Sequence, residues 1–324
     1  MIVTVVSMPE VAVTRTDLSQ ARERLAEAAF LAVDIELPAD GPAPEPPIAA
    51  QLGLDADELD WFGSKDEPAR AEFLGDRAGV VVPVVHEGRV DHVHAVVTER
   101  FLVTVHWGHV GLADGITAAF RHERPTDSVA AFFLVLQEAL DTFRRAAVRA
   151  LLETEELEDD MFEDREPEQV RRLALLRRRS AVMHHALLPY LQVIDTILSR
   201  RMMSPTFPEA RQRAAQGFQS AGRLVLADIE SLQDATRRAM ASYSSLVAGE
   251  QNGVINRLAI VSVIFLPLSF LTGFFGMNFT FLTDELESRA VFWLLAIGLQ
   301  VVVVLGSFYF LHRTRIWRRI RDDD

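Results

Sequence analysis

The sequence predicts an α+β membrane protein, in which an N-terminal cytosolic α/β domain precedes a long helical stalk continuous with the first of two C-terminal transmembrane helices. Three observations lead to this prediction. Segments rich in β-branched residues occupy the first third of the chain. A helix-forming stretch without proline separates Pro208 from Pro267. Two apolar runs without a charged residue, 258–275 and 291–311, are each long enough to cross a membrane.

The α/β domain is expected over residues 1–125. Its predicted strands are rich in valine and are separated by turn residues; they cover 3–6, 30–37, 79–85, 93–97 and 101–106. Helices are expected within 18–32 and at 48–55. The proline-rich stretch between them, 41–47, is predicted to be a loop.

Two cytosolic antiparallel helices are expected over residues 126–207. The first begins near Asp127, because Asp and Ser after a proline suit a helix N-cap, and it carries an acidic run at 153–164. Pro167 opens the second helix, which extends to about residue 200. That helix is rich in arginine between 171 and 179. The opposite charges of the two helices suit an antiparallel pair.

The stalk is expected over 208–257 and enters the membrane as the first transmembrane helix, 258–278. Pro208 suits a first helical position, and the whole helix would be roughly 100 Å long. Pro267 lies inside the first span, where neighbouring helices and hydroxyl side chains make a kink tolerable. An outer loop, 279–290, leads to the second span, 291–311, and a basic cytosolic tail follows at 312–324.

Charge and composition predict orientation and exclude several classes of function. The tail is rich in arginine whereas the outer loop is acidic, so both termini are expected in the cytoplasm and the protein in the cytoplasmic membrane, within the lipid bilayer. The net charge of −13 argues against a nucleic-acid partner, and without cysteine neither disulfides nor thiolate metal sites form. No basic leader is seen, so no cleaved signal peptide is expected. No catalytic constellation is recognised, so no enzyme is expected.

One face of the long helix has the composition of a pore lining. Its residues recur every three or four positions and are small or polar between larger apolar ones: Asn252, Ile255, Ala259, Ser262, Leu266, Ser269, Gly273 and Gly276. Asn252 and Ser269 would form polar rings, and Ile255, Leu258 and Leu266 would form apolar constrictions that gate by dewetting. The alternative is helix–helix packing, which membrane helices also build from small residues.

These features resemble the CorA magnesium-channel family. The resemblance is carried by Phe-Leu-Pro-Leu-Ser-Phe-Leu-Thr-Gly-Phe-Phe-Gly-Met-Asn-Phe at 265–279, where Gly-Met-Asn ends the first of two C-terminal spans. Segments 101–106 and 176–189 are also similar to the family, so that the likeness is close over 250–321 and loose elsewhere. The family usually has threonine at the position of Ser269, and a hydroxyl is retained here.

The resemblance implies a homopentamer in which five long helices line one pore and the second spans surround them. Gly276, Met277 and Asn278 would form the outer selectivity motif, with a collar of Asn278 amide oxygens at the mouth. Mg²⁺ sheds water reluctantly and prefers oxygen neighbours, and conduction needs binding weak enough for release. Glu285 is a candidate cation-collecting residue of the outer loop, one position beyond the family's Pro-Glu-Leu.

The function expected from the resemblance is a divalent-cation channel for Mg²⁺, with Co²⁺ and Ni²⁺ tolerated. Cytosolic Mg²⁺ held by carboxylates between subunits would close it, so Mg²⁺ would be both cargo and regulator. The candidate carboxylates are the run 153–164 and Asp228, Glu230 and Asp234; the sequence does not choose among them, and a solvated surface is the alternative. Passive and proton-coupled transport both remain open.

Alternative interpretations remain for the function and for several residues. A ZntB-type zinc transporter has the same architecture, although Met277 favours magnesium because zinc relatives usually replace it. A membrane-anchored sensor that conducts nothing is a third possibility. Gly276 to Asn278 would also serve as a helix C-cap. The histidines at 92, 94, 106 and 109 suit a zinc site, but solvated or hydrogen-bonded strand histidines are favoured.

Overall fold

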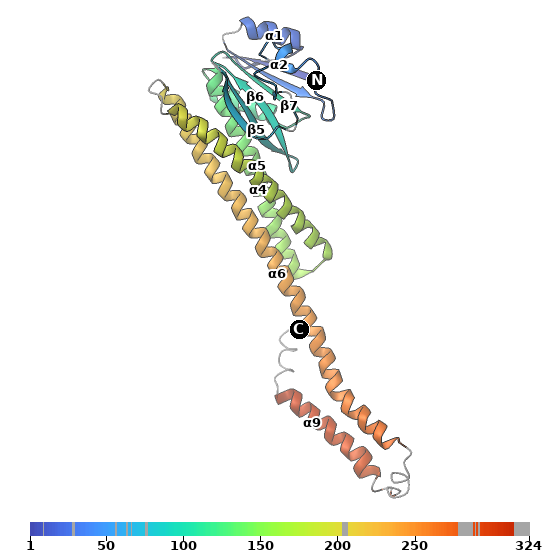
Figure 1. The fold of residues 1–324 in the computed structure, drawn as a ribbon. Coiled ribbons are helices and arrows are strands. Elements are labelled where there is room, and N and C mark those ends of the chain that lie inside the picture. Colours follow the sequence, from blue (N-terminus) through green and yellow to red (C-terminus); the bar gives the residue numbers. More distant parts are fainter. Residues whose placement is uncertain are drawn as a thin grey trace. The chain divides into compact units, whose positions relative to one another are not determined.

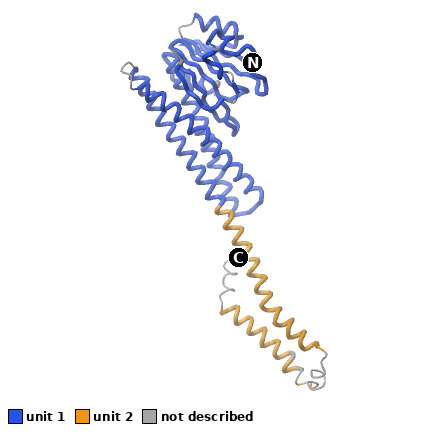
Figure 2. Tube along the Cα trace, viewed as in Figure 1, with its two compact units in different colours: residues 1–240 blue, residues 241–324 orange. Residues whose placement is uncertain are grey.

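The computed structural model describes residues 1–8, 10–27, 30–55, 57–62, 64–65, 67–74, 77–202, 207–277, 288, 290 and 292–313 (Figure 1). The chain divides into two compact units, Met1–Met240 and Ala241–Asp324 (Figure 2). The division falls inside one continuous helix, α6 (Glu209–Phe275), so the predicted stalk and first span are one element. The domain boundaries expected from the sequence, with a stalk ending at 257, stay predictions.

Unit 1 contains a seven-stranded sheet in the order β2-β1-β3-β7-β6-β5-β4. Its strands are β1 (Ile2–Ser7), β2 (Ala12–Thr16), β3 (Leu31–Leu37), β4 (Arg70–Leu74), β5 (Arg77–His86), β6 (Arg89–Val97) and β7 (Phe101–Trp107). Only the β3–β7 pair is parallel among these described strands. The five predicted strands are the five inner ones, and the sequence prediction missed both edge strands. Their side chains are mostly exposed in β2, which removes the apolar signal.

Helices cover both faces of the sheet. On one face, α1 (Leu18–Glu27) and α2 (Ile48–Gln51) close the main core, in which Leu18, Leu25 and Ile48 pack with alternate residues of β1 and β7. On the other face lies α4 (Ser128–Glu163), which contacts β5. The Val85 N–H of β5 donates to Thr142 Oγ1 of α4 at 2.9 Å. A further helix, α3 (Leu112–Glu123), packs against α4 and was not predicted.

The remaining helices of unit 1 form an elongated layer. Helix α4 begins where predicted, because the Asp127 side chain accepts the Ala130 N–H at 2.7 Å and caps the helix. Helix α5 (Pro167–Met202) packs on it. An ion pair, Arg172 to Glu153 at 3.4 Å, joins their acidic and basic stretches. Because exposed ion pairs contribute little, buried apolar residues, among them Leu157 and Leu173, contribute more to this pairing than this ion pair does.

The first half of α6 packs against α5. Tyr190 and Phe218 meet edge to face with their ring centroids 5.9 Å apart, and both are buried. Gly222 lets the two helices approach closely, because a Cβ at this position would lie 2.5 Å from Leu191 Cδ2. Further along the helix, Gln233 Nε2 donates to the Ser180 carbonyl at 3.4 Å.

Unit 2 holds the second half of α6 and a returning helical segment. The returning segment starts as a π-helical stretch, η1 (Phe292–Gly298), and continues as α9 (Leu299–Arg313). Gln300 Nε2 of α9 donates to Thr272 Oγ1 of α6 at 3.3 Å. Two helices, Glu209–Phe275 and Trp293–Arg313, are long and apolar enough to cross a membrane, and their apolar windows are almost uncovered within the chain.

Candidate functional site

The predicted pore face forms a continuous uncovered line along the unit 2 part of α6. At 3.6 residues per turn its members lie on one side of the helix, and every one of them is exposed; they are Asn252, Ile255, Ala259, Ser262, Leu266, Ser269, Gly273 and Gly276, named here the stripe. Leu258 borders the stripe and is exposed as well. The structure therefore brings all the described pore candidates to one surface.

Partial burial in this segment falls on the opposite side of the helix. The half-buried positions recur with the same spacing but are rotated by about half a turn; they are Gly253, Asn256, Ile260, Ile264, Pro267, Leu268, Leu271 and Phe275. The stripe is consequently at the centre of the surface that a single chain leaves open. In a candidate membrane span, a surface of this kind is available to lipid, to water or to further copies of the chain.

The stripe alternates oxygen ligands with large apolar side chains. The Ser262 hydroxyl donates to the Leu258 carbonyl at 2.8 Å, which leaves its oxygen lone pairs facing outward as acceptors. The apolar members are far from covered, with exposed fractions of 60% at Ile255, 65% at Leu258 and 73% at Leu266. Packed around a common axis, such residues would form wet polar rings separated by dewetting constrictions.

The C-terminal end of α6 closes without a left-handed residue among the described ones. The Gly276 N–H donates to the Thr272 carbonyl at 3.0 Å, and the Met277 N–H donates to the Phe274 carbonyl at 3.3 Å. Positive φ angles occur at Gly53, Gly88, Gly108 and Gly111 but not at Gly276, so the left-handed C-cap interpretation does not apply to Gly276. Asn278 and Glu285 lie outside the described residues.

The four candidate histidines do not form a metal site. His94 is buried between the rings of Trp61 and Trp107, and this burial lowers its pKa to about 4. His106 Nε2 lies 3.3 Å from Asp34 Oδ2, and its Nδ1 lies 2.7 Å from the Gly108 carbonyl. Within the part of the chain that the structure describes, no group of three His, Asp or Glu side chains is arranged to hold a metal ion.

The candidate regulatory carboxylates are distributed along the helices rather than clustered. Asp234 pairs with Arg237 at 3.2 Å, while Asp228 lies 3.9 Å from Arg144 and Glu230 lies 4.0 Å from His184. The three carboxylates are themselves exposed, so these contacts contribute little to stability. Among the described residues, these carboxylates form no group of three that could hold a metal ion.

Sequence reasoning missed a connection at the start of α6. Arg211 Nη1 and Nη2 donate to the two carboxylate oxygens of Glu99 at 2.9 and 2.7 Å, and Nη2 also reaches Asp127 at 3.2 Å. Glu99 follows β6 and Asp127 caps α4, so one guanidinium joins α6 to the sheet and to α4. The partners are 112 and 84 residues away along the chain, and no local pattern links them.

A comparison with known protein families decides the affiliation of the chain. Residues 32–313 match the family described as CorA-like Mg²⁺ transporter protein. The chain belongs to the CorA family. Members of this family are transporters of divalent cations in membranes, which agrees with the two membrane-competent helices and with the resemblance found in the sequence.

Individual CorA relatives are distant and include both magnesium and zinc proteins. The zinc transport protein ZntB of Yersinia enterocolitica is 28% identical over 162 residues, covering 49% of this chain and 47% of that protein. The cobalt/magnesium transport protein CorA of Thermotoga maritima is 26% identical over 165 residues, covering 49% and 44%. The chain thus spans about half the length of these relatives.

A solved CorA structure agrees with the fold over nearly the whole chain. The complete structure of the CorA magnesium transporter from Methanocaldococcus jannaschii superposes with a TM-score of 0.76 at 18% identity, covering 96% of this chain and 97% of that one. This likeness establishes the architecture predicted from the sequence: an α/β domain, a long helix and a C-terminal pair of apolar helices.

Proposed function

We propose that this chain assembles as a homopentamer and conducts Mg²⁺ across the cytoplasmic membrane, with Co²⁺ and Ni²⁺ as further cargo. The observation that carries the proposal is the stripe of α6, in which small and polar residues are interspersed with Ile255 and Leu266 and which is exposed along its whole length in the single chain. Five stripes facing one axis would give Mg²⁺ a path lined with neutral oxygen ligands, which suit a hard cation that must be released again.

The selectivity proposal places the outer filter at Gly276, Met277 and Asn278. Gly276 and Met277 follow the last turn of α6 directly, and Asn278 is the next residue in the sequence. A ring of five Asn278 amide oxygens there would hold a hydrated Mg²⁺ without trapping it. Glu285 and the other acidic residues of the segment 279–290 would raise the local cation concentration at this mouth.

The gating proposal assigns a second role to Mg²⁺ outside the pore. Both termini lie in the cytoplasm, and cytosolic Mg²⁺ bound between neighbouring chains holds the pore closed. The proposal is supported by the carboxylates of Asp228, Glu230 and Asp234 on α6, which are exposed to a neighbouring chain and can each bind Mg²⁺ together with retained water. Millimolar Mg²⁺ should then protect unit 1 from proteolysis, and unchanged cleavage would count against this gating mechanism.

Zinc transport is the second candidate function. Zinc and cobalt/magnesium transport proteins are similar to this chain to nearly the same degree. ZntB of Yersinia enterocolitica is 28% identical over the matched segment, and CorA of Thermotoga maritima is 26% identical. Met277 favours magnesium, because the zinc members of the family usually have another apolar residue there. The two candidates predict different cargo for the same pathway.

Ion uptake by reconstituted liposomes tests the proposal. Purified protein is incorporated with a Mg²⁺-sensitive or a Zn²⁺-sensitive dye inside, and uptake is driven by an inside-negative potential. We expect saturable Mg²⁺ uptake that Asn278→Ala abolishes while the assembly survives. Asn256→Ala, which alters an asparagine on the half-buried side of α6, is the matched control and should leave uptake unchanged. Uptake of Zn²⁺ without Mg²⁺ would favour the second candidate, and no uptake of either ion would favour a sensor.

A further inference from the structure

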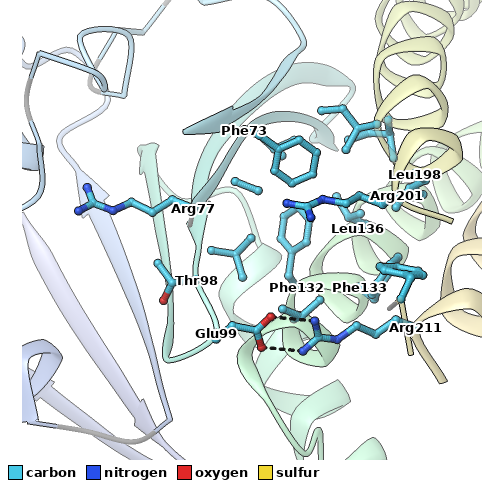
Figure 3. Close-up of a pocket in the computed structure, with 17 residues that line it drawn as sticks. Phe73, Arg77, Thr98, Glu99, Phe132, Phe133, Leu136, Leu198, Arg201 and Arg211 are labelled. Carbon is cyan, nitrogen blue, oxygen red and sulfur yellow. Dashed lines mark hydrogen bonds and ion pairs between the residues drawn. The ribbon is translucent and has the colours of Figure 1, made fainter. Parts of the chain in front are cut away.

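A hollow opens in unit 1 where the sheet meets α4, α5 and the start of α6. Figure 3 shows its lining, which comes from segments widely separated in the sequence. The cavity volume is about 160 Å³. Its walls are apolar, and the residues that contribute most are Phe73, Phe132, Phe133, Leu136, Ile197 and Leu198. An apolar cavity of about 150 Å³ accommodates one benzene ring, so this hollow has room for a body of about six carbons.

Two lining arginines, Arg201 and Arg211, bring positive charge to the hollow, and the carboxylate of Glu99 lines it beside them. The guanidinium of Arg77, a third lining arginine, points away from the other labelled side chains (Figure 3). Both oxygens of Glu99 are engaged by Arg211, which also reaches Asp127 outside the lining. The charge of Arg211 is therefore compensated by two carboxylates.

Arg201 is the lining arginine available to a ligand. It is exposed on α5, and its Cζ lies 4.1 Å from the ring centroid of Phe73. Figure 3 shows the two side chains next to each other. Among the described residues no carboxylate lies within ion-pair distance of Arg201, in contrast to Arg211. Stacking on the ring leaves the edge of the guanidinium plane free to donate two parallel hydrogen bonds, the geometry that suits a carboxylate.

We propose that this hollow binds a small amphipathic carboxylate, with an apolar body of about six carbons among the phenylalanines and its carboxylate on Arg201. The single guanidinium of Arg201 matches one carboxylate, and the volume matches one ring rather than a lipid acyl chain. Phe207 and Arg211 line the hollow beside the first turn of α6. A bound ligand therefore touches the start of the helix that carries the stripe.

Binding of 3-phenylpropionate to the full-length protein in detergent tests the site by isothermal titration calorimetry. 3-Phenylpropan-1-ol, which has the same apolar body without the charge, is the matched probe, and heats from protein-free micelles are subtracted. We expect saturable binding of the acid in the millimolar range or tighter, and at least about tenfold weaker binding of the alcohol. Equal affinities for the two probes, or no saturable binding of the acid, would overturn the proposal.

Three variants locate the binding. Arg201→Gln should reduce the affinity for the acid to that for the alcohol, whereas Arg200→Gln, an exposed neighbour on α5 that does not line the hollow, should bind like the wild type. Ile197→Phe fills the hollow from a half-buried position and should abolish binding of both probes. Unchanged binding of the acid in Arg201→Gln overturns the proposal on its own, since this exposed substitution leaves the fold intact.

Discussion

Arg211 should be the most important single charged residue for attaching α6 to the rest of unit 1. Replacing it by glutamine removes a bidentate pair with Glu99 and a contact with Asp127. The Glu99 side chain is 70% exposed, so water screens the pair, although Arg211 itself is only 19% exposed. We therefore expect Arg211→Gln to lower the free energy of unfolding of unit 1 by about 1–2 kcal/mol, between a surface ion pair and a buried one.

Urea unfolding of the detergent-solubilised protein measures this loss. Trp61 and Trp107 are buried in the sheet domain and report its unfolding by fluorescence. With an m-value of about 3 kcal/mol per molar, the midpoint should fall by about 0.5 M. Arg213→Gln is the matched control, because its contact with Glu209 is 3.9 Å long and both side chains are more than 70% exposed. Equal midpoints for the two variants would refute the reasoning.

The same prediction has a pH dependence of known sign. Hydrogen bonds from Arg211 hold the pKa of Glu99 below its ordinary value. A carboxylate with a lowered folded pKa contributes stability that is present above its unfolded pKa, about 4.3, and is lost as the pH falls through the folded value. The difference between wild type and Arg211→Gln should therefore be constant above about pH 5.5 and shrink on acidification. A constant difference down to pH 3 would assign the effect to another cause.

Three further predictions concern packing, a buried histidine and the pore. Gly217→Ala should stabilise the protein by up to about 1 kcal/mol, because alanine favours the helix and nothing lies within 4 Å of the new methyl group. Gly222→Ala should destabilise the protein, because its methyl group would press against Leu191. Thermal unfolding of the two variants tests both predictions. Burial lowers the pKa of His106, but Asp34 and the Gly108 carbonyl outweigh it and the net shift is upward. His106 therefore adds stability below pH 6.5 that is lost as the pH rises through its folded pKa, and urea titrations of Asp34→Asn should lack this alkaline loss. Leu266→Ala should increase Mg²⁺ uptake into liposomes, because it widens a proposed constriction. Leu271→Ala, on the half-buried side of α6, should leave uptake unchanged. Equal effects of the two substitutions would contradict a gate at Leu266.

The fold could be predicted from the sequence wherever a periodic apolar signal was present. The five inner strands are rich in valine because they are covered on at least one face, while the edge strand β2 shows its side chains to solvent and carries no such signal. Helix α3 follows Gly111, whose φ of 67° marks a turn that the sequence analysis did not recognise. The helical period alone placed the stripe on one side of α6.

The sites that depend on tertiary contacts were not predictable in the same way. Arg211 meets partners from two other elements, and the hollow near Arg201 is built from strands and helices far apart in the sequence. The histidines show the same limit. Their spacing was compatible with a zinc site, but the contacts that decide against it come from other elements: His94 packs against Trp61 and Trp107, and His106 pairs with Asp34. Side-chain proximity between elements is set by packing, which no local pattern encodes.

The measurement that tests the central claim most directly is cysteine accessibility along α6. The chain contains no cysteine, so single cysteines can be introduced without a background. Ser262→Cys, Leu266→Cys and Ser269→Cys on the stripe should react with a charged, water-soluble thiol reagent, and the modification should block Mg²⁺ uptake. Ile260→Cys, Ile264→Cys and Leu271→Cys on the half-buried side should stay unreactive. The opposite labelling pattern would mean that the stripe does not face water, and the proposed pore would be wrong.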